Sequence, residues 1–163
     1  MNDTNKPGSI GQVMPGTEIS IHDLEAPHDP MPMGERGEVR IKGPQVMKGY
    51  LNRPEETAES LRDGLFRTGD VGYMDEDGHF FLVDRMKDLI LCSGYNVYPR
   101  MVEEAIYLHP SVAEVTVIGI DDDYRGQSPK AFVKLKEGEQ VTEAEMKSFL
   151  EDKLSKIEMP SEI

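Results

Sequence analysis

Residues 83–90 read Val-Asp-Arg-Met-Lys-Asp-Leu-Ile, and residues 92–99 read Cys-Ser-Gly-Tyr-Asn-Val-Tyr-Pro. An arginine and a lysine stand two residues apart at the end of an apolar run, and a glycine loop and a proline-led helix follow. Before this stretch the sequence is typical of short strands and turns, whereas after it helix and strand patterns alternate. We therefore place a domain boundary between Val83 and Asp88, with a first domain over residues 1–83 and a second over residues 84–163.

The first domain carries the alternation of half-buried strands. Apolar and polar residues alternate in Glu18–His22 and again in Gly37–Lys42, which gives each strand one apolar face. The segment between these strands is rich in turn-forming residues and predicts a loop, to which belong Pro27, Pro30, Pro32 and Gly34.

Two Asp-Gly pairs, Asp63-Gly64 and Asp77-Gly78, predict turns in the rest of the first domain. The second pair separates Gly72–Met74 from His79–Val83, so these two segments are expected to form a hairpin. Pro54–Leu61 predicts a short helix, because a proline in the first turn loses no helical hydrogen bond.

Two helices are expected in the second domain. The first begins at Pro99 and ends before Pro110, since the residue before a proline disfavours helical backbone. Its apolar stripe consists of Val102, Ala105 and Ile106. The second begins at Thr142, which forms a capping box with Glu145, and the cap is worth about 1 kcal/mol. Its core-facing stripe consists of Met146, Phe149, Leu150 and Leu154.

Two strands alternate with these helices, over Val112–Ile120 and Ala131–Leu135. In the second strand Phe132 lies on one face, and Ala131, Val133 and Leu135 lie on the other. Helices that alternate with strands favour a small α/β sandwich for the second domain.

The composition indicates a folded protein without a nucleic-acid-binding surface. Of the 163 residues 37% are hydrophobic and 30% are charged, which provides enough apolar side chains for a core. The net charge of −13 disfavours nucleic acid, which requires a basic surface. A single cysteine, the lack of any apolar run of about 20 residues and the polar N-terminus favour a cytoplasmic protein with no transmembrane segment.

Four motifs occur in order along the chain: Gly43–Asn52, with the pattern GxxVxxGYxN; Phe66–Asp70, which ends in Thr-Gly-Asp; Leu82–Pro99; and Glu103–Gly119. Gly8–Val13 precedes them. Together they resemble the AMP-forming acyl-CoA synthetases of the ANL adenylating superfamily, and they look closest to its fatty-acid–CoA ligases. Each motif alone is a weak signal, whereas four at family spacing are a strong one.

The resemblance implies an α+β fold in two parts. Residues 1–83 would end a large N-terminal domain as an incomplete, distorted antiparallel β-barrel. Residues 84–163 would form a truncated C-terminal α/β lid with a short sheet and flanking helices. Lys87 matches the hinge about which such a lid rotates between two reactions, a process called domain alternation. On residue type alone, Lys87 is equally an ordinary exposed lysine.

The resemblance assigns nucleotide binding to Asp70, Leu82 and Arg85. The Asp70 carboxylate would accept hydrogen bonds from both ribose hydroxyls of ATP or AMP, although a Gly-Asp turn explains the same residues. Arg85 would contact the ribose and the phosphates, and the alternative is a surface ion pair with Asp84 or Asp88. Leu82 would line the nucleotide site, be a strand core residue, or do both.

Ser93 and Gly94 correspond to the family loop that lines the tunnel for the pantetheine arm of coenzyme A, and a hairpin turn is compatible with that role. Cys92 has no paired histidine and is interpreted as structural. Mg²⁺ would bridge the ATP phosphates, but no metal ligand is identified, since Asp121-Asp122-Asp123 lacks the spacing of a calcium loop and favours a solvated turn.

The family's phosphate-binding loop does not occur in this sequence, and its catalytic lysine would lie beyond Ile163. No catalytic residue is therefore assigned, and the fragment alone is expected to be inactive. Barrel strands that are normally completed upstream would leave unpaired edges, so we expect self-association through residues before Val83.

The expected activity of the parent protein is that of an acid–thiol ligase. The resemblance implies that a carboxylic acid, fatty or aryl, reacts with ATP and coenzyme A to give acyl-CoA, AMP and pyrophosphate through an acyl-adenylate. Two alternatives stay open: an adenylation domain that loads a carrier protein, and a non-catalytic stand-alone lid or interaction module.

Overall fold

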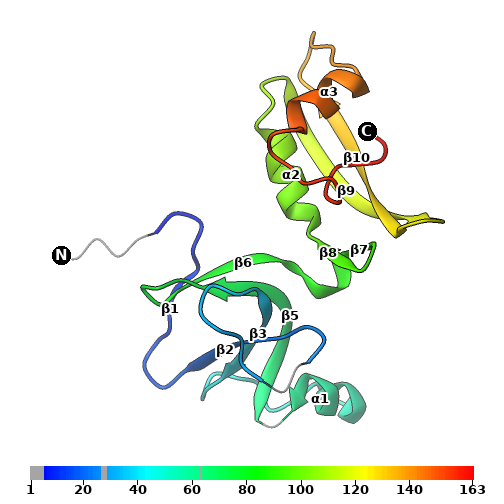
Figure 1. Ribbon diagram of the computed structural model, residues 1–163. Coiled ribbons are helices and arrows are strands. Elements are labelled where there is room, and N and C mark those ends of the chain that lie inside the picture. The colour runs from blue at the N-terminus through cyan, green and yellow to red at the C-terminus, as the bar shows by residue number, and fades with distance from the viewer. Residues whose placement is uncertain (1–5, 27–28, 63) are drawn as a thin grey trace. The chain divides into compact units, whose positions relative to one another are not determined.

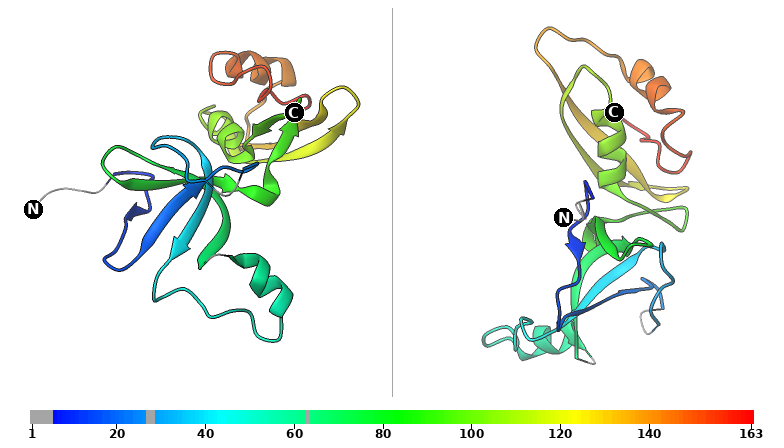
Figure 2. Two further views of the ribbon diagram at one scale, coloured as in Figure 1. Left: turned by 60° about the horizontal axis from the view of Figure 1, so that its bottom comes forward. Right: turned by 90° about the vertical axis from the view of Figure 1, so that its left-hand side faces the viewer.

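The computed structural model describes residues 6–26, 29–62 and 64–163 (Figures 1 and 2). These residues divide into two compact units, one up to Met86 and one from Lys87 onward. Three features that the sequence analysis used lie wholly or partly outside the described residues: the N-terminal residues 1–5, Pro27 in the loop, and Asp63 in the first Asp-Gly turn.

The first unit is a six-stranded antiparallel sheet with one short helix. Its strands follow the order β1-β6-β5-β3-β2, and β4 pairs with β5. The two predicted strands, the hairpin at Asp77-Gly78 and the helix beginning at Pro54 are confirmed. The elements are β1 (Gly11–Gln12), β2 (Glu18–His22), β3 (Gly37–Lys42), α1 (Pro54–Ser60), β4 (Leu61–Arg62), β5 (Leu65–Met74) and β6 (His79–Arg85).

β1 and β2 lie at the two ends of this strand order, so the sheet of the described residues does not close into a barrel. The outer edge of β2 is nevertheless partly occupied, because the Met31 amide donates to the Ile21 carbonyl oxygen at 2.7 Å. A bridge between His22 and Pro30 extends this contact. The expectation of an unpaired edge is therefore wrong at this end of β2, because the loop after the strand folds back along it.

The apolar core of the first unit is small. Ile21, Val39 and Phe80 are buried together where β2, β3 and β6 contribute one face each. Five partly buried residues pack around them: Ile19, Met31, Ile41, Met74 and Leu82.

The second unit is a four-stranded antiparallel sheet with two helices. Its strands follow the order β8-β7-β10-β9, and a short 3₁₀ helix, η1 (Met86–Asp88), spans the division between the units. The sheet is antiparallel, because tight turns connect β7 to β8 and β9 to β10. The elements are β7 (Ile90–Cys92), β8 (Tyr95–Val97), α2 (Pro99–Tyr107), β9 (Val112–Asp122), β10 (Gly126–Leu135) and α3 (Glu143–Leu150).

Both predicted helices form where local sequence signals place them. α2 begins at Pro99, and its predicted stripe is buried. The Thr142 hydroxyl accepts from the Glu145 amide, and the Glu145 carboxylate accepts from the Thr142 amide at 2.8 Å, so the capping box is confirmed. The second helix ends at Leu150 rather than near Leu154, because the chain turns after Leu150; Leu154 still packs on the core.

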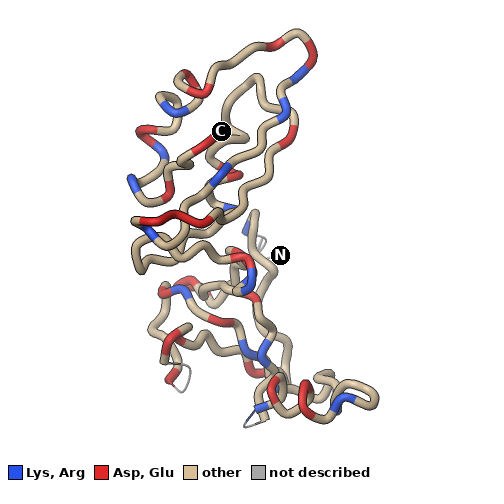
Figure 3. Tube along the Cα trace, turned by 90° about the vertical axis from the view of Figure 1, so that its right-hand side faces the viewer, with Lys and Arg blue, Asp and Glu red and all other residues tan. Residues whose placement is uncertain are grey.

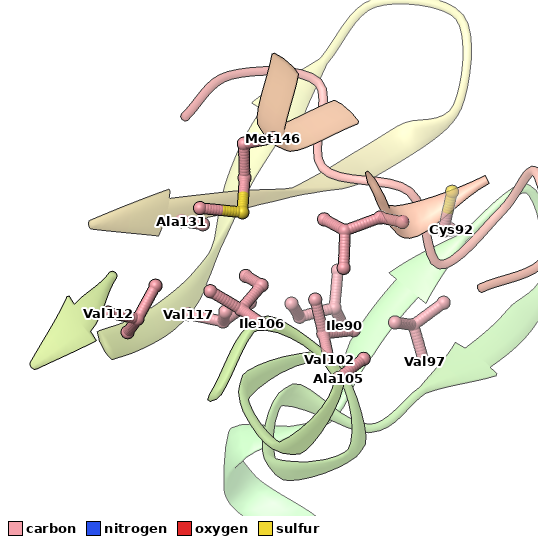
Figure 4. Packing of buried hydrophobic residues seen from close by; sticks show 11 residues of the cluster. Ile90, Cys92, Val97, Val102, Ala105, Ile106, Val112, Val117, Ala131 and Met146 are labelled. Atoms are coloured by element: carbon pink, nitrogen blue, oxygen red, sulfur yellow. The ribbon is translucent and has the colours of Figure 1, made fainter. Parts of the chain in front are cut away.

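One contiguous apolar cluster holds the second unit together (Figure 4). Residues from the sheet and from both helices meet in it, and Met146 of α3 points toward Ala131 of β10. Its buried members are Ile90, Cys92, Val97, Val102, Ala105, Ile106, Val112, Val117, Ala131, Met146 and Leu150.

Acidic and basic residues are interspersed along both units (Figure 3). Most ion pairs involve exposed side chains, such as Lys134 with Glu114 at 2.7 Å. None of the described helices combines the length with the apolar composition that crossing a membrane requires.

Candidate functional site

The Thr-Gly-Asp motif forms a bulge at the middle of β5. β3 and β5 pair at Arg40 and Arg67, and the next pair is Glu38 with Val71. One residue therefore lies between the two pairs on β3, and three lie between them on β5. The intervening β5 residues therefore have no partner in the ladder with β3, although Asp70 keeps its partner on β6. Gly69 has a φ of 71°, a left-handed conformation that glycine adopts without steric cost.

Asp70 and Arg85 lie directly opposite each other on β5 and β6. The Arg85 Nε lies 3.2 Å from the Asp70 Oδ1, with 27% of the Asp70 side chain and 64% of the Arg85 side chain exposed. Arg85 thus pairs with Asp70, while Asp84 accepts the Arg85 backbone amide at 2.8 Å. The structure brings together two of the residues assigned to the nucleotide and leaves both within reach of a ligand.

The third residue of that set, Leu82, is partly buried and packs on the small core of the first unit. It lies opposite Gly72 on β5, three residues before Arg85. The structure therefore gives Leu82 the place of a strand core residue, and a contact with a nucleotide stays a prediction.

A buried charge network lies beside the motif and was not foreseen. Alternation in β3 predicts a strand with one exposed polar face, yet Glu38 is 2% exposed and Arg40 is 7% exposed. The Glu38 Oε2 accepts from Arg40 Nη2 at 2.9 Å and from Arg67 Nε at 3.1 Å. Because the carboxylate is paired with two guanidinium groups, the polar face of β3 can be buried.

The Thr68 side chain was also missed. Its hydroxyl donates to the Val39 carbonyl oxygen at 2.7 Å and accepts from the Asp70 amide at 3.0 Å. One signal in the sequence could have indicated this role: Thr68 lies two residues before Asp70. At that spacing a threonine hydroxyl can accept a hydrogen bond from the backbone amide of the later residue.

Lys87 is exposed and belongs to η1, immediately after the division between the two units. Within the described part of the chain its side chain makes no ion pair or hydrogen bond. A solvated side chain on a one-turn helix allows the backbone to rotate without breaking side-chain contacts, and the hinge role of Lys87 stays a prediction.

Ser93 and Gly94 form the two-residue turn between β7 and β8. Both have positive φ, 54° for Ser93 and 82° for Gly94, as a type I′ hairpin requires. The Ser93 amide donates to the Arg125 carbonyl oxygen at 2.7 Å, which ties the exposed tip to the β9–β10 turn. The hairpin is confirmed, and its contact with coenzyme A stays a prediction.

The described residues contain no group of three or more His, Cys, Asp or Glu side chains placed to hold a metal ion. The Asp122 carboxylate instead accepts the amides of Arg125 and Tyr124, and these backbone donors lower the pKa of Asp122. Asp121 and Asp122 end β9, and the turn follows. The described residues therefore offer no ligand set for Mg²⁺. Cys92 is buried in the core of its unit.

Two family descriptions match separate parts of the sequence. Residues 1–51 match the AMP-binding enzyme family, and residues 101–163 match the AMP-binding enzyme C-terminal domain. The chain belongs to the AMP-binding enzyme family. The resemblance found in the motifs is thereby confirmed.

Curated relatives of this family member are CoA ligases. The long-chain-fatty-acid–CoA ligase of Bacillus subtilis is 51% identical over 156 residues, which are 96% of this chain and 28% of the relative. The 2-succinylbenzoate–CoA ligase of Geobacillus kaustophilus is 44% identical over 158 residues, 97% of this chain and 32% of the relative. The chain therefore spans about a third of the length of these relatives.

Solved structures agree in fold. ATP-bound MatB from Rhodopseudomonas palustris superposes with a TM-score of 0.90 and 38% identity, covering 96% of this chain and 31% of that one. The o-succinylbenzoate CoA synthetase of Bacillus subtilis, in complex with its acyl-adenylate intermediate, gives a TM-score of 0.86 at 36% identity, covering 96% and 31%. The α+β class with antiparallel sheets is thus shared with adenylate-forming enzymes.

Proposed function

We propose that this chain supplies the ribose contact and the pivot of an AMP-forming acyl-CoA ligase. The whole protein would join a fatty or aryl carboxylic acid to coenzyme A. In the first step a carboxylate oxygen attacks the α-phosphorus of ATP, and the bond to pyrophosphate breaks. In the second step the sulfur of coenzyme A attacks the acyl carbon, the thiol proton is released, and AMP leaves with the bonding electron pair.

The observation that carries this proposal is the Asp70–Arg85 pair on adjoining strands. An ionised carboxylate only accepts hydrogen bonds and has two oxygens, which suits the two hydroxyls of a ribose. Each such charge-assisted bond contributes about 1.5–3 kcal/mol. The Arg85 guanidinium beside it would donate to the ribose and phosphate oxygens, and its fixed fork of donors favours that geometry.

The second unit would serve the second step. In this proposal it is a lid that turns about Lys87, and the first unit is part of a barrel-like subdomain of the large domain. The Ser93-Gly94 tip would then line the passage for the pantetheine arm. Its exposed two-residue turn has the small cross-section that insertion beside a thin ligand requires.

The test uses a chimera in which this chain replaces the matching segment of the Bacillus subtilis long-chain-fatty-acid–CoA ligase. We expect the chimera to form acyl-adenylate and acyl-CoA. Asp70→Asn should raise the KM for ATP about ten-fold or more, since a charge-assisted hydrogen bond is weakened. Asp77→Asn, at the far end of the same hairpin, is the matched control and should leave the KM unchanged.

Three outcomes would count against the proposal. A chimera that forms no adenylate while the parent ligase does would contradict the assignment to this reaction. Equal KM values for Asp70→Asn and the unsubstituted chimera would contradict the ribose contact. Adenylate formation with transfer to a carrier protein, but not to coenzyme A, would favour a carrier-loading adenylation domain instead.

A further inference from the structure

The Thr68 hydroxyl occupies the place of the missing ladder bonds in the bulge of β5. Between the Arg40–Arg67 and Glu38–Val71 pairs, β3 contributes only Val39. The Val39 carbonyl oxygen accepts from the Thr68 hydroxyl at 2.7 Å, and the same hydroxyl accepts from the Asp70 amide at 3.0 Å. A hydroxyl can donate and accept at once, so one side chain joins both strands to the residue that carries the carboxylate.

The two ends of the bulge are fixed by other contacts. Before it, the Arg67 Nε lies 3.2 and 3.1 Å from the two oxygens of the buried Glu38 carboxylate. After it, Val71 is buried and paired with Asp84 on β6. Between these fixed points Gly69 adopts a left-handed backbone, and Asp70 keeps its partner Arg85 on β6 but has no ladder partner on β3. Thr68 provides the tie on the β3 side.

We propose that Thr68 is a positioning residue, which fixes the Asp70 amide and thereby directs the Asp70 carboxylate at the two ribose hydroxyls of the nucleotide. The inference rests on the proposed function and adds a residue to it. Thr68 itself does not touch the ligand; it acts through Asp70. The hydroxyl of Thr68 is the required group, so serine can replace it and the isosteric valine cannot.

The experiment compares ATP with 2′-deoxy-ATP in the chimera, because only a well-placed Asp70 distinguishes a diol from a single hydroxyl. The unsubstituted chimera should show a KM for 2′-deoxy-ATP about ten-fold above that for ATP. Thr68→Val should bring this ratio close to that of Asp70→Asn, mainly through a higher KM for ATP. Thr68→Ser should restore the ratio to within about two-fold of the unsubstituted chimera.

A matched control separates positioning from general loss of stability. The Thr57 hydroxyl also donates to one carbonyl oxygen, of Arg53 at 2.7 Å, and accepts from one amide, of Tyr50 at 2.9 Å. Thr57→Val should therefore lose comparable hydrogen bonds in the same unit. It should leave the ratio of the KM for 2′-deoxy-ATP to the KM for ATP unchanged. If Thr57→Val lowers the ratio as much as Thr68→Val does, the inference is wrong.

Amide hydrogen exchange on the 163-residue chain gives a readout that needs no nucleotide. Thr68→Val should accelerate exchange of the Asp70 amide at least several-fold, whereas Thr68→Ser should not.

The ratio of the KM for 2′-deoxy-ATP to the KM for ATP separates failure of this inference from failure of the proposed function. A ratio near one in the unsubstituted chimera would overturn the ribose contact of Asp70 and, with it, this inference. A high ratio that survives Thr68→Val would overturn the inference alone.

Discussion

The two units bury different kinds of side chain. In the second unit one cluster of eleven buried residues, nearly all aliphatic, joins the sheet to both helices. In the first unit the corresponding cluster has three buried members, and a carboxylate and a guanidinium group are buried beside it. Burial of a large apolar side chain contributes about 1.5–3 kcal/mol without a partner, whereas a buried charge is tolerated only while its partners are present.

This difference has a consequence for where the candidate site lies. The Asp70–Arg85 pair lies in the unit with the smaller apolar core, on a bulge that polar contacts hold in place. Hydrogen bonds and ion pairs are directional, so they can fix a carboxylate in one orientation, which non-directional apolar packing does less well. We infer that the first unit is specified by polar geometry and the second by packing.

The sharpest way to break this comparison is to remove the Glu38 carboxylate. Glu38→Ala should destabilise the first unit by about 3–5 kcal/mol, because two arginines lose their buried partner. Denaturant unfolding followed by NMR should show signals of the first unit lost at lower denaturant, with signals of the second unit little changed.

The control for that experiment is Glu114→Ala in the second unit. Glu114 also pairs with a cation, Lys134, but both side chains are 68% exposed. An exposed pair contributes little, so the control should shift the unfolding midpoint far less. Equal effects of the two substitutions would refute the distinction between the units.

A smaller effect is expected at the capping box of α3. Thr142→Ala should cost about 1 kcal/mol, because the Glu145 amide loses its acceptor. Hydrogen bonds from the Thr142 amide and then from its hydroxyl lower the pKa of Glu145. The capping box therefore stabilises the folded state at pH values above the ordinary glutamate pKa, and this stabilisation is lost as the pH falls through the lowered pKa.

An NMR titration of the Glu145 carboxyl carbon measures this effect. In Thr142→Ala the pKa of Glu145 should rise toward its ordinary value, because one of the two Thr142 donors is gone. An unchanged pKa together with unchanged stability would show that the box contributes nothing to the second unit.

The smallest expected effect is self-association of the first unit, which stays a proposal. The edge of β2 at Glu18–Ser20 and the two-residue strand β1 are the sheet ends at which a second copy can pair. Because the loop at Met31 already occupies part of the β2 edge, the association should be weak. Light scattering should show the mean mass rising with concentration; a constant monomer mass up to high concentration would contradict it.

Local signals accounted for most of the elements. Pro99 at the start of α2, Thr142 with Glu145 at α3 and Asp77-Gly78 at the β5–β6 hairpin are each recognised within four or five residues, and each is where the sequence predicts it. The candidate site residues Asp70 and Arg85 were found through family resemblance, because a Gly-Asp pair alone is also a common turn.

What the sequence determined by itself was therefore the set of elements, their caps and turns, and the family to which the chain belongs. Tertiary structure decided the rest: that Arg85 pairs with Asp70 rather than Asp84, that Glu38 is buried, and that Thr68 holds the bulge. The physical reason is how far apart in the sequence the interacting residues lie. Caps and turns depend on neighbours along the chain, whereas strand register and the pairing of buried charges depend on residues that lie 15 to 29 positions apart in the sequence.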